Sequence, residues 1–390
     1  MAEQSKTLKQ KMSRRDFFKM AGSALVGLAA GYYLTKLPKI KIPQQIESKP
    51  TVSVVKGPAE YNDDVVETVK KAVEKVNYLN KVLDSNSKVV LKPNLMYAQP
   101  AEKGTTTSGI VVKGVIEYLN ELGIENITIA EGPCCATTIN EVLQVTKIKP
   151  LLNKKVKYVD VAMTSASIAD VPSPCVWKQM FVGDVFLDAD MVISIPKLKT
   201  HCRTLFSMSL KNFVGSTPAD YYAFVVDNSP FVRQKLHADG ELQPQQDKIH
   251  GSIADINSII QPKFSVVDGI IGVDGNSPFE PTIKKWGVIV AGDNPLAVDA
   301  IIARLGGYDP NRIAHMKLFA LKGLGKLEQS EITLVSDVSK LDITAPSFDL
   351  EFAKKYFRTP AVKKVSASYP YAKFETIEEW REVANLKELL

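Results

Sequence analysis

The stretch that decides the fold, residues 88–131, reads KVVLKPNLMYAQPAEKGTTTSGIVVKGVIEYLNELGIENITIAE. Its β-branched start, 88–92, predicts a buried strand. Apolar residues at helical spacing over 110–122 predict a helix that ends at Gly123, a residue typical of helix C-termini. A second strand is expected at 126–131. This strand-helix-strand order predicts a parallel pair joined by a right-handed crossover.

The same alternation continues on both sides of this stretch. Thr51 to Val55 predicts a strand, and the apolar residues between Val65 and Leu79 recur at helical spacing. Further strands are expected at 156–161, 191–195, 264–268, 287–291 and 332–335. The sequence therefore predicts an α/β fold with a mainly parallel sheet flanked by helices.

A long irregular insertion interrupts this pattern between the late strands, at 199–246. It contains several prolines, and we expect short helices that form a lid or cap. Beyond Pro346 the pattern is helical and charged. We expect three parts: a leader with tether at 1–41, an α/β domain at 42–345 and a helical extension at 346–390. The insertion's aromatic residues are Tyr221, Tyr222, Phe224 and Phe231.

The positive charge of the chain is concentrated at its N-terminus. Residues 1–41 contain nine of the 49 Lys and Arg and two of the 43 acidic residues, which leaves 40 basic and 41 acidic residues in the remainder. The remainder is thus close to neutral, and it has no stripe of Lys and Arg interleaved with aromatics. These features argue against a nucleic-acid partner.

The N-terminal segment resembles a twin-arginine leader. Arg14 and Arg15 are followed by Phe17 and Phe18, and an uncharged apolar run spans 20–34. The alternative is a basic surface helix. The resemblance implies export by the twin-arginine machinery to the outer face of the membrane or the periplasm. As a helix the run is about 22 Å long, shorter than a bilayer core of ~30 Å, so it can anchor only with its flanking apolar residues.

Several lysines directly follow predicted strands. Lys92 and Asn94 follow one strand, and Lys197 and Lys199 follow another. The carboxyl ends of parallel strands share one edge, where open α/β sheets bind ligands. Clustered ammonium groups repel one another unless an anion is present, so we expect an anionic small-molecule ligand. The alternative is that each lysine is exposed at a loop start. The remaining candidates for this edge are Thr200, His201, Lys211 and Asn212.

Acidic residues in the same setting suggest a divalent metal ion. Glu131, Asp268 and Asp274, together with Asn94 or Asn212, would supply the oxygen ligands that Mg²⁺ prefers. Two further acids have other interpretations. Asp293 begins a turn and is expected to cap the following helix. Asp299 belongs to the same acidic group without an assigned role.

The histidines and cysteines limit the kinds of catalytic group and metal site that the sequence can supply. His201 adjoins the lysines and is the candidate general base, with Lys197 and Lys199 as the other catalytic candidates. His250 is expected to have a structural or surface role, and His237 and His315 are expected to lie on helix surfaces. The four cysteines form no C-x-x-C, so an iron-sulfur cluster within this chain is not expected. A disulfide in an exported chain would join Cys175 to Cys202.

Six short motifs taken in order resemble one family. They are VVLKPN at 89–94, AEG at 130–132, IPKLKTH at 195–201, LKN at 210–212, VDGIIG at 267–272 and AGDNPLAVDA at 291–300. The family is catalogued as domain of unknown function 362. Because some of its members carry or adjoin ferredoxin modules, the resemblance implies a redox link and a redox protein partner. This chain departs from those members in lacking clustered cysteines.

Two functions are compatible with these observations. The first is an exported enzyme, metal-dependent or redox-associated, in which lysines hold an anionic small molecule and His201 transfers protons. The second is a non-catalytic factor that binds a cofactor or assembles a partner at the membrane. An exposed apolar face on the insertion would favour the second, and a lid over the lysines the first.

Overall fold

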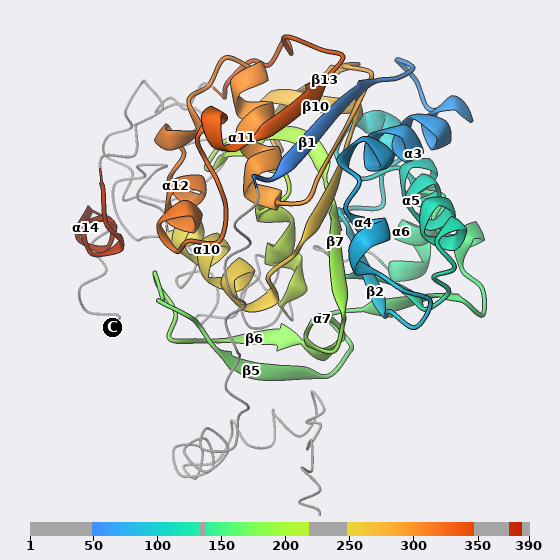
Figure 1. Ribbon diagram of the computed structural model, residues 1–390, viewed down its shortest axis with the longest axis horizontal. Coiled ribbons are helices and arrows are strands. Elements are labelled where there is room, and N and C mark those ends of the chain that lie inside the picture. The colour runs from blue at the N-terminus through green and yellow to red at the C-terminus, as the bar shows by residue number, and fades with distance from the viewer. Residues whose placement is uncertain (1–48, 133–137, 218–247, 347–373, 384–390) are drawn as a thin grey trace, which may run out of the picture.

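The computed structural model describes residues 49–132, 138–217, 248–346 and 374–383 (Figure 1). Within these ranges, no helix is both long and apolar enough to cross a membrane. The twin-arginine segment, Cys134 and Cys135 lie outside the described residues. So do the aromatic residues of the insertion, His237 and most of the expected C-terminal extension.

The centre of the molecule is one twisted sheet, which has 11 strands within the described residues. Its main path runs β13-β1-β12-β10-β7-β2-β3-β4. β12 pairs antiparallel with both β1 and β10, and the other strands of the path run in one direction. The predicted mainly parallel sheet is therefore confirmed. The strands of the path are β1 (Thr51–Lys56), β2 (Val89–Pro93), β3 (Ile127–Glu131), β4 (Val156–Asp160), β7 (Met191–Ile195), β10 (Phe264–Asn276), β12 (Val288–Gly292) and β13 (Thr333–Ser336).

Helices cover both faces of the sheet (Figure 1). The side chains of β12 show the two faces: Ile289 and Ala291 belong to the core beneath α3 and α5, and Val288 and Val290 to the core beneath α11 and α12. This alternation follows from the two-residue period of a strand. On one side lie α3 (Asp64–Val76), α4 (Leu79–Val82), α5 (Gly109–Glu121) and α6 (Ile139–Val145), and on the other α10 (Lys248–Ile260), α11 (Pro295–Leu305) and α12 (Ala314–Leu321).

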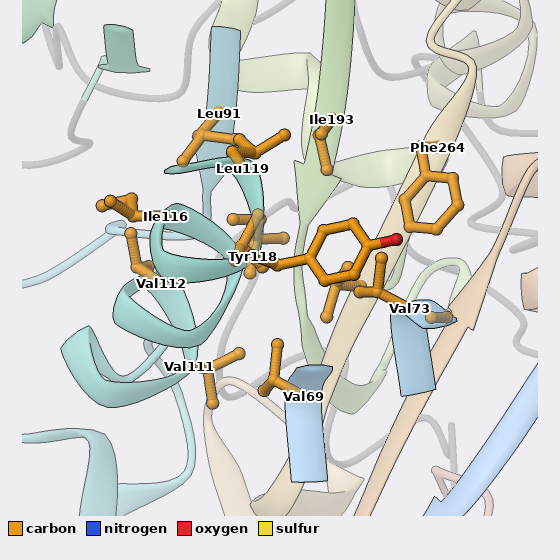
Figure 2. Close-up of a cluster of buried hydrophobic side chains, with 14 of the residues drawn as sticks. Val69, Val73, Leu91, Val111, Val112, Ile116, Tyr118, Leu119, Ile193 and Phe264 are labelled. Carbon is orange, nitrogen blue, oxygen red and sulfur yellow. The ribbon is translucent and has the colours of Figure 1, made fainter. Parts of the chain in front are cut away.

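The first core joins α3 and α5 to the strands (Figure 2). Val69 and Val73 of α3 face the apolar side of α5, and Phe264 of β10 closes the cluster. The two helices touch closely at Gly114, where a Cβ atom would lie 2.8 Å from Cβ of Val69. Burial of each such large apolar side chain stabilises the fold by about 1.5–3 kcal/mol.

The structure corrects the start of the predicted insertion. Lys197 to His201 form strand β8 (Lys197–His201), which continues β7 beyond Pro196 and pairs in parallel with β10. The long β10 makes this possible, since it runs eight residues past the predicted end at Asp268. The lysines of this segment therefore lie on a strand and not at the start of a loop. Smaller elements are β5 (Ala166–Asp170), β6 (Gln179–Gly183), β9 (Leu205–Phe206), β11 (Glu280–Lys284), α7 (Asp184–Leu187) and α14 (Ile377–Val383), with 3₁₀ turns at Ala101–Lys103, Lys149–Leu151, Lys211–Ser216, Pro310–Arg312 and Gln329–Glu331.

Helix α14 packs against α10 and α12, where Trp380 joins a buried cluster with Ala254 and Leu318. Trp380 is fully buried, and its ring lies where a side chain on Gly251 would otherwise be. Arg381 donates to the carbonyl oxygens of Pro174 and Cys175. The described part of the C-terminal segment is thus held to the domain by an aromatic side chain and a guanidinium group.

Candidate functional site

The predicted lysines lie at the carboxyl ends of the central strands. Lys92 is near the end of β2, Glu131 ends β3, and β8 extends the line of β7. Strands β7, β2 and β3 are consecutive neighbours, so their carboxyl ends meet at one edge. The shared edge expected from the sequence is present.

Lys92 and Glu131 form a buried ion pair at this edge. Nζ of Lys92 lies 2.6 Å from Oε2 of Glu131, and the lysine side chain is fully buried. The carboxylate also accepts the backbone N–H groups of Leu95 and Gly132 at 3.1 and 2.9 Å. Burial lowers the pKa of Lys92 and raises that of Glu131, and their mutual attraction opposes both shifts. Because its carboxylate is already fully engaged, Glu131 acts as the counterion of Lys92.

Lys197 and Asp268 form a second buried ion pair. Nζ of Lys197 lies 2.9 Å from Oδ2 of Asp268 and also donates to the hydroxyl of Tyr61. Tyr61 in turn donates to Asp268 at 3.0 Å, and the N–H of Ser108 reaches the same carboxylate at 2.9 Å. Ser108 is the residue directly before the N-terminus of α5, whose dipole favours a carboxylate there. The pair therefore has hydrogen-bond partners on both sides.

Lys199 has a different environment from these two paired lysines. Its Nζ donates to Oδ1 of Asn94 and to the carbonyl oxygen of Thr105, both at 2.9 Å. No carboxylate lies within ion-pair distance of it in the described part of the chain. Burial, followed by the charges of Lys211 and Lys197, lowers the pKa of Lys199 to about 7, with smaller effects of Glu131, which opposes the shift, and of Lys92. Lys199 is thus a buried amine poised to be neutral near physiological pH.

Lys211 and Asn212 begin the 3₁₀ turn Lys211–Ser216. Lys211 is half-buried and lies close enough to Lys199 to affect its pKa. Asn212 donates from Nδ2 to the carbonyl oxygen of Lys92 at 2.6 Å and to Oγ of Ser194 at 3.1 Å. These contacts fix the end of β2, so Asn212 positions the backbone of Lys92.

Thr200 and His201 are less central. Thr200 donates from its hydroxyl to the carbonyl oxygen of Gly275 at 2.8 Å, a contact between β8 and β10. Nδ1 of His201 accepts the N–H of Arg203 at 3.2 Å, and the side chain is half-buried. Because strand side chains alternate, His201 shares a face of β8 with Lys197 and Lys199. Thr200 lies on the opposite face and has a structural contact.

The structure does not bring the three predicted metal ligands together. Glu131 and Asp268 are each paired with a lysine, whereas Asp274 accepts the N–H of Thr344 at 2.8 Å and lies 3.4 Å from Nζ of Lys284. Among the described residues, no three His, Cys, Asp or Glu side chains form a group able to hold a metal ion. The prediction of a Glu131, Asp268 and Asp274 site is wrong because each carboxylate is satisfied by a different partner.

Residues 89–304 match the family model described as "Domain of unknown function (DUF362)". The chain belongs to the DUF362 family. It is 21% identical over 266 residues to a thylakoid-associated protein of Synechocystis sp., which covers 68% of this chain and 77% of that protein. The lactate racemase apoprotein from Thermoanaerobacterium thermosaccharolyticum is 11% identical and covers 85% of this chain and 96% of that one. Its TM-score is 0.36, too low a likeness to support a conclusion about this chain.

This candidate site also contains residues that the sequence motifs did not indicate. Tyr61 contacts both members of the Lys197 pair, and Thr107 accepts the N–H of Asn94 at 2.9 Å. Two signals were available in the sequence. Tyr61 follows β1 at the same edge, and residues 105–108 form a run of four hydroxyl side chains directly before a helix. All four are buried, which is unusual for such a polar run.

Other predicted roles in this DUF362 protein change with the structure. His315 is buried and not on a helix surface: its Nδ1 lies 3.1 Å from Nδ1 of His250, which is also buried. Burial and the neighbouring His250 and Lys211 lower the pKa of His315. Cys175 and Cys202 are both free thiols, so the disulfide considered for them is not formed.

Two further acidic residues, Asp293 and Asp299, accept hydrogen bonds from backbone N–H groups. Asn294, and not Asp293, caps α11 by accepting the N–H of Ala297 at 3.0 Å, whereas Asp293 accepts the N–H of Thr51 at 2.8 Å. Asp299 accepts the N–H groups of Ser209 and Leu210, the two residues before Lys211. These carboxylates hold chain segments around the site and are not available to a ligand.

Proposed function

We propose that this chain is an enzyme that binds an anionic small molecule at the carboxyl edge of the sheet. One observation carries the proposal. Lys92, Lys197 and Lys199 gather at one edge, and within the described residues Glu131 and Asp268 pair with the first two whereas Lys199 has neutral acceptors. When Lys199 is protonated, its charge in this region of low dielectric favours an anion.

The lysines of this site have different roles in the proposal. Lys92 and Lys197 are held by their counterions and shape the site. Lys199, with neutral oxygen acceptors only, is the group that can exchange a proton with a bound molecule. His201, on the same face of β8, is the second candidate for proton transfer. Lys211 and Asn94, which neighbour this amine, are both half-buried.

The test is direct binding of small anions by the purified full-length chain. Titration calorimetry with phosphate and with small carboxylates is expected to find an anion that binds. Lys211→Gln and Lys199→Gln are each expected to weaken its binding about tenfold, because each removes an N–H donor and a bound anion favours the charged form of Lys199, whose pKa is about 7. Lys263→Gln is the matched control, because Lys263 is a half-buried lysine at the opposite end of β10. Unchanged affinity in both site variants would contradict the proposal.

We also propose that the chain is exported by the twin-arginine machinery and acts outside the cytoplasm. The support is the sequence around Arg14 and Arg15 with the apolar run that follows. Fractionation of cells expressing the full chain is expected to find it at the outer face of the cell membrane or in the periplasm. An Arg14→Lys, Arg15→Lys variant should remain in the cytoplasm, and a Lys6→Gln, Lys9→Gln variant should not. Retention of the unaltered chain in the cytoplasm would refute export.

A further inference from the structure

The hydrogen bonds of Lys199 fit a neutral amine. A neutral Nζ has two N–H donors and one lone pair, whereas an ammonium group has three donors. The described residues offer Nζ two acceptors, Oδ1 of Asn94 and the carbonyl oxygen of Thr105. These two acceptors use both N–H groups of the neutral form and leave its lone pair unused. An ammonium group would keep one buried donor without an acceptor, which is unfavourable.

The neighbouring lysines reinforce this state. Lys92 and Lys197 have carboxylates at 2.6 and 2.9 Å, respectively, whereas the described residues offer Lys199 no carboxylate at ion-pair distance. An amine beside other cations in a desolvated site loses its proton more readily, which is one way that enzymes make a nucleophilic lysine. The lowered pKa of about 7 agrees with this geometry.

We propose that Lys199 is a carbonyl-reactive amine, and that the ligand of this site is an anionic aldehyde or ketone that forms an imine with it. This inference rests on the proposed function, because the same lysine cluster must first bind the anionic group. It adds the class of substrate and a covalent step. The anionic group would lie near the charged Lys211 and the carbonyl carbon against Nζ of Lys199.

The step balances without an oxidant or a reductant. The lone pair of Nζ attacks the carbonyl carbon, a C–N bond forms, and the C=O π electrons move to oxygen. The two hydrogen atoms of the amine leave with that oxygen as water, which gives a C=N bond. Uptake of one proton makes the imine cationic, and its N–H can donate to Asn94 or Thr105. The substrate's own anionic group offsets the new positive charge.

The experiment uses two small anionic carbonyl compounds, glyoxylate and pyruvate, with cyanoborohydride as the trapping reductant. Glycolate, which has a hydroxyl group in place of the aldehyde, is the matched probe without a carbonyl. After incubation of the full-length chain, peptide mapping by mass spectrometry is expected to find Lys199 with the mass of the keto or aldehyde acid less one oxygen atom. Wild-type mapping identifies the reactive lysine even where a Lys199→Gln variant does not fold.

Selectivity and pH dependence distinguish Lys199 from ordinary lysines. At pH 7 its rate of modification is expected to exceed that of Lys263 and of the exposed lysines by at least about tenfold, since a larger fraction of Lys199 is neutral. Above about pH 8 its rate should level off, while the rates of exposed lysines continue to rise. Lys199→Gln should abolish the selective adduct, and Lys263→Gln should leave it unchanged.

The two proposals can fail separately. If glycolate binds and loses affinity in the Lys211→Gln variant, but neither carbonyl probe modifies Lys199 selectively, the imine is refuted and anion binding stands. If glycolate and both carbonyl probes fail to bind and no selective adduct forms, both proposals are refuted. A selective adduct at Lys199 supports both.

Discussion

Lys197 and Asp268 form an ion pair of 2.9 Å in which neither side chain is exposed to solvent. The two residues also occupy facing positions where β8 pairs with β10, so the ion pair and the strand pairing reinforce each other. A buried pair of this kind contributes little when intact compared with an apolar pair, but the loss of one partner leaves an uncompensated charge.

Removal of the carboxylate of Asp268 should destabilise the fold strongly. Asp268→Asn leaves the ammonium group of Lys197 buried without a counterion. We expect the free energy of unfolding to fall by about 3–5 kcal/mol, measured by urea denaturation. Glu60→Gln is the control, because the ion pair of Glu60 with Lys285 is exposed and its loss should leave the midpoint unchanged. Equal effects of the two substitutions would contradict the structure.

The contribution of Lys199 to stability should depend on pH. With a folded-state pKa of about 7 and an unfolded value near 10.5, the unfolded chain binds more protons between these two values. The wild type should therefore gain stability relative to Lys199→Met as pH rises from about 7 to 10, by up to about 1.4 kcal/mol per pH unit. The difference in unfolding free energy between the two proteins, followed across this range, provides the measurement. A constant difference would show that Lys199 is charged in the folded state.

The contribution of Asp299 to stability should have the opposite pH dependence. Burial raises the pKa of this carboxyl to about 7, so between about pH 4 and 7 the folded chain keeps a proton that the unfolded chain has lost. The wild type should lose stability relative to Asp299→Asn as pH rises through this range, by up to about 1.4 kcal/mol per unit. Thermal unfolding of both proteins between pH 4 and 8 measures this pH dependence. If the stability of the wild type relative to Asp299→Asn rose with pH, the raised pKa of Asp299 would be refuted.

Two glycines beside the first ion pair should respond differently to the same substitution. A Cβ atom on Gly215 would lie 2.4 Å from Oε1 of Glu131, an oxygen already held by a backbone N–H. Gly215→Ala should therefore displace the carboxylate and destabilise the fold by about 1–3 kcal/mol. Gly132→Ala is the matched control, since its nearest contact would be an ordinary 3.4 Å. Urea denaturation compares them, and equal stability of both variants would contradict the close approach.

Much of the fold was predictable because it depends on local patterns. The strand and helix over 88–122 were predicted within one residue of their observed bounds, since a buried strand and an amphipathic helix have distinct hydrophobic periods. Strand β8 was missed because Pro196 is a signal for a turn. The strand forms nevertheless, because the long β10 supplies a partner beyond that proline.

The site was predictable in its location but not in its pairings. The sequence placed Lys92, Lys197 and Lys199 at the carboxyl edge, and the structure has them there. It grouped Glu131, Asp268 and Asp274 as metal ligands, although each carboxylate has a different partner. The identity of a partner depends on which strands are neighbours and in which register they pair, and a single sequence does not specify that register.

The sequence by itself determined the alternation of strands and helices, the mainly parallel sheet and the edge at which charged side chains gather. These features follow from periodicity along the chain and from the common direction of parallel strands. Only the tertiary structure decided that Glu131 and Asp268 neutralise two lysines and leave Lys199 with neutral acceptors. The physical reason is that the protonation state of a buried amine depends on distances of a few ångströms to groups far away in the sequence.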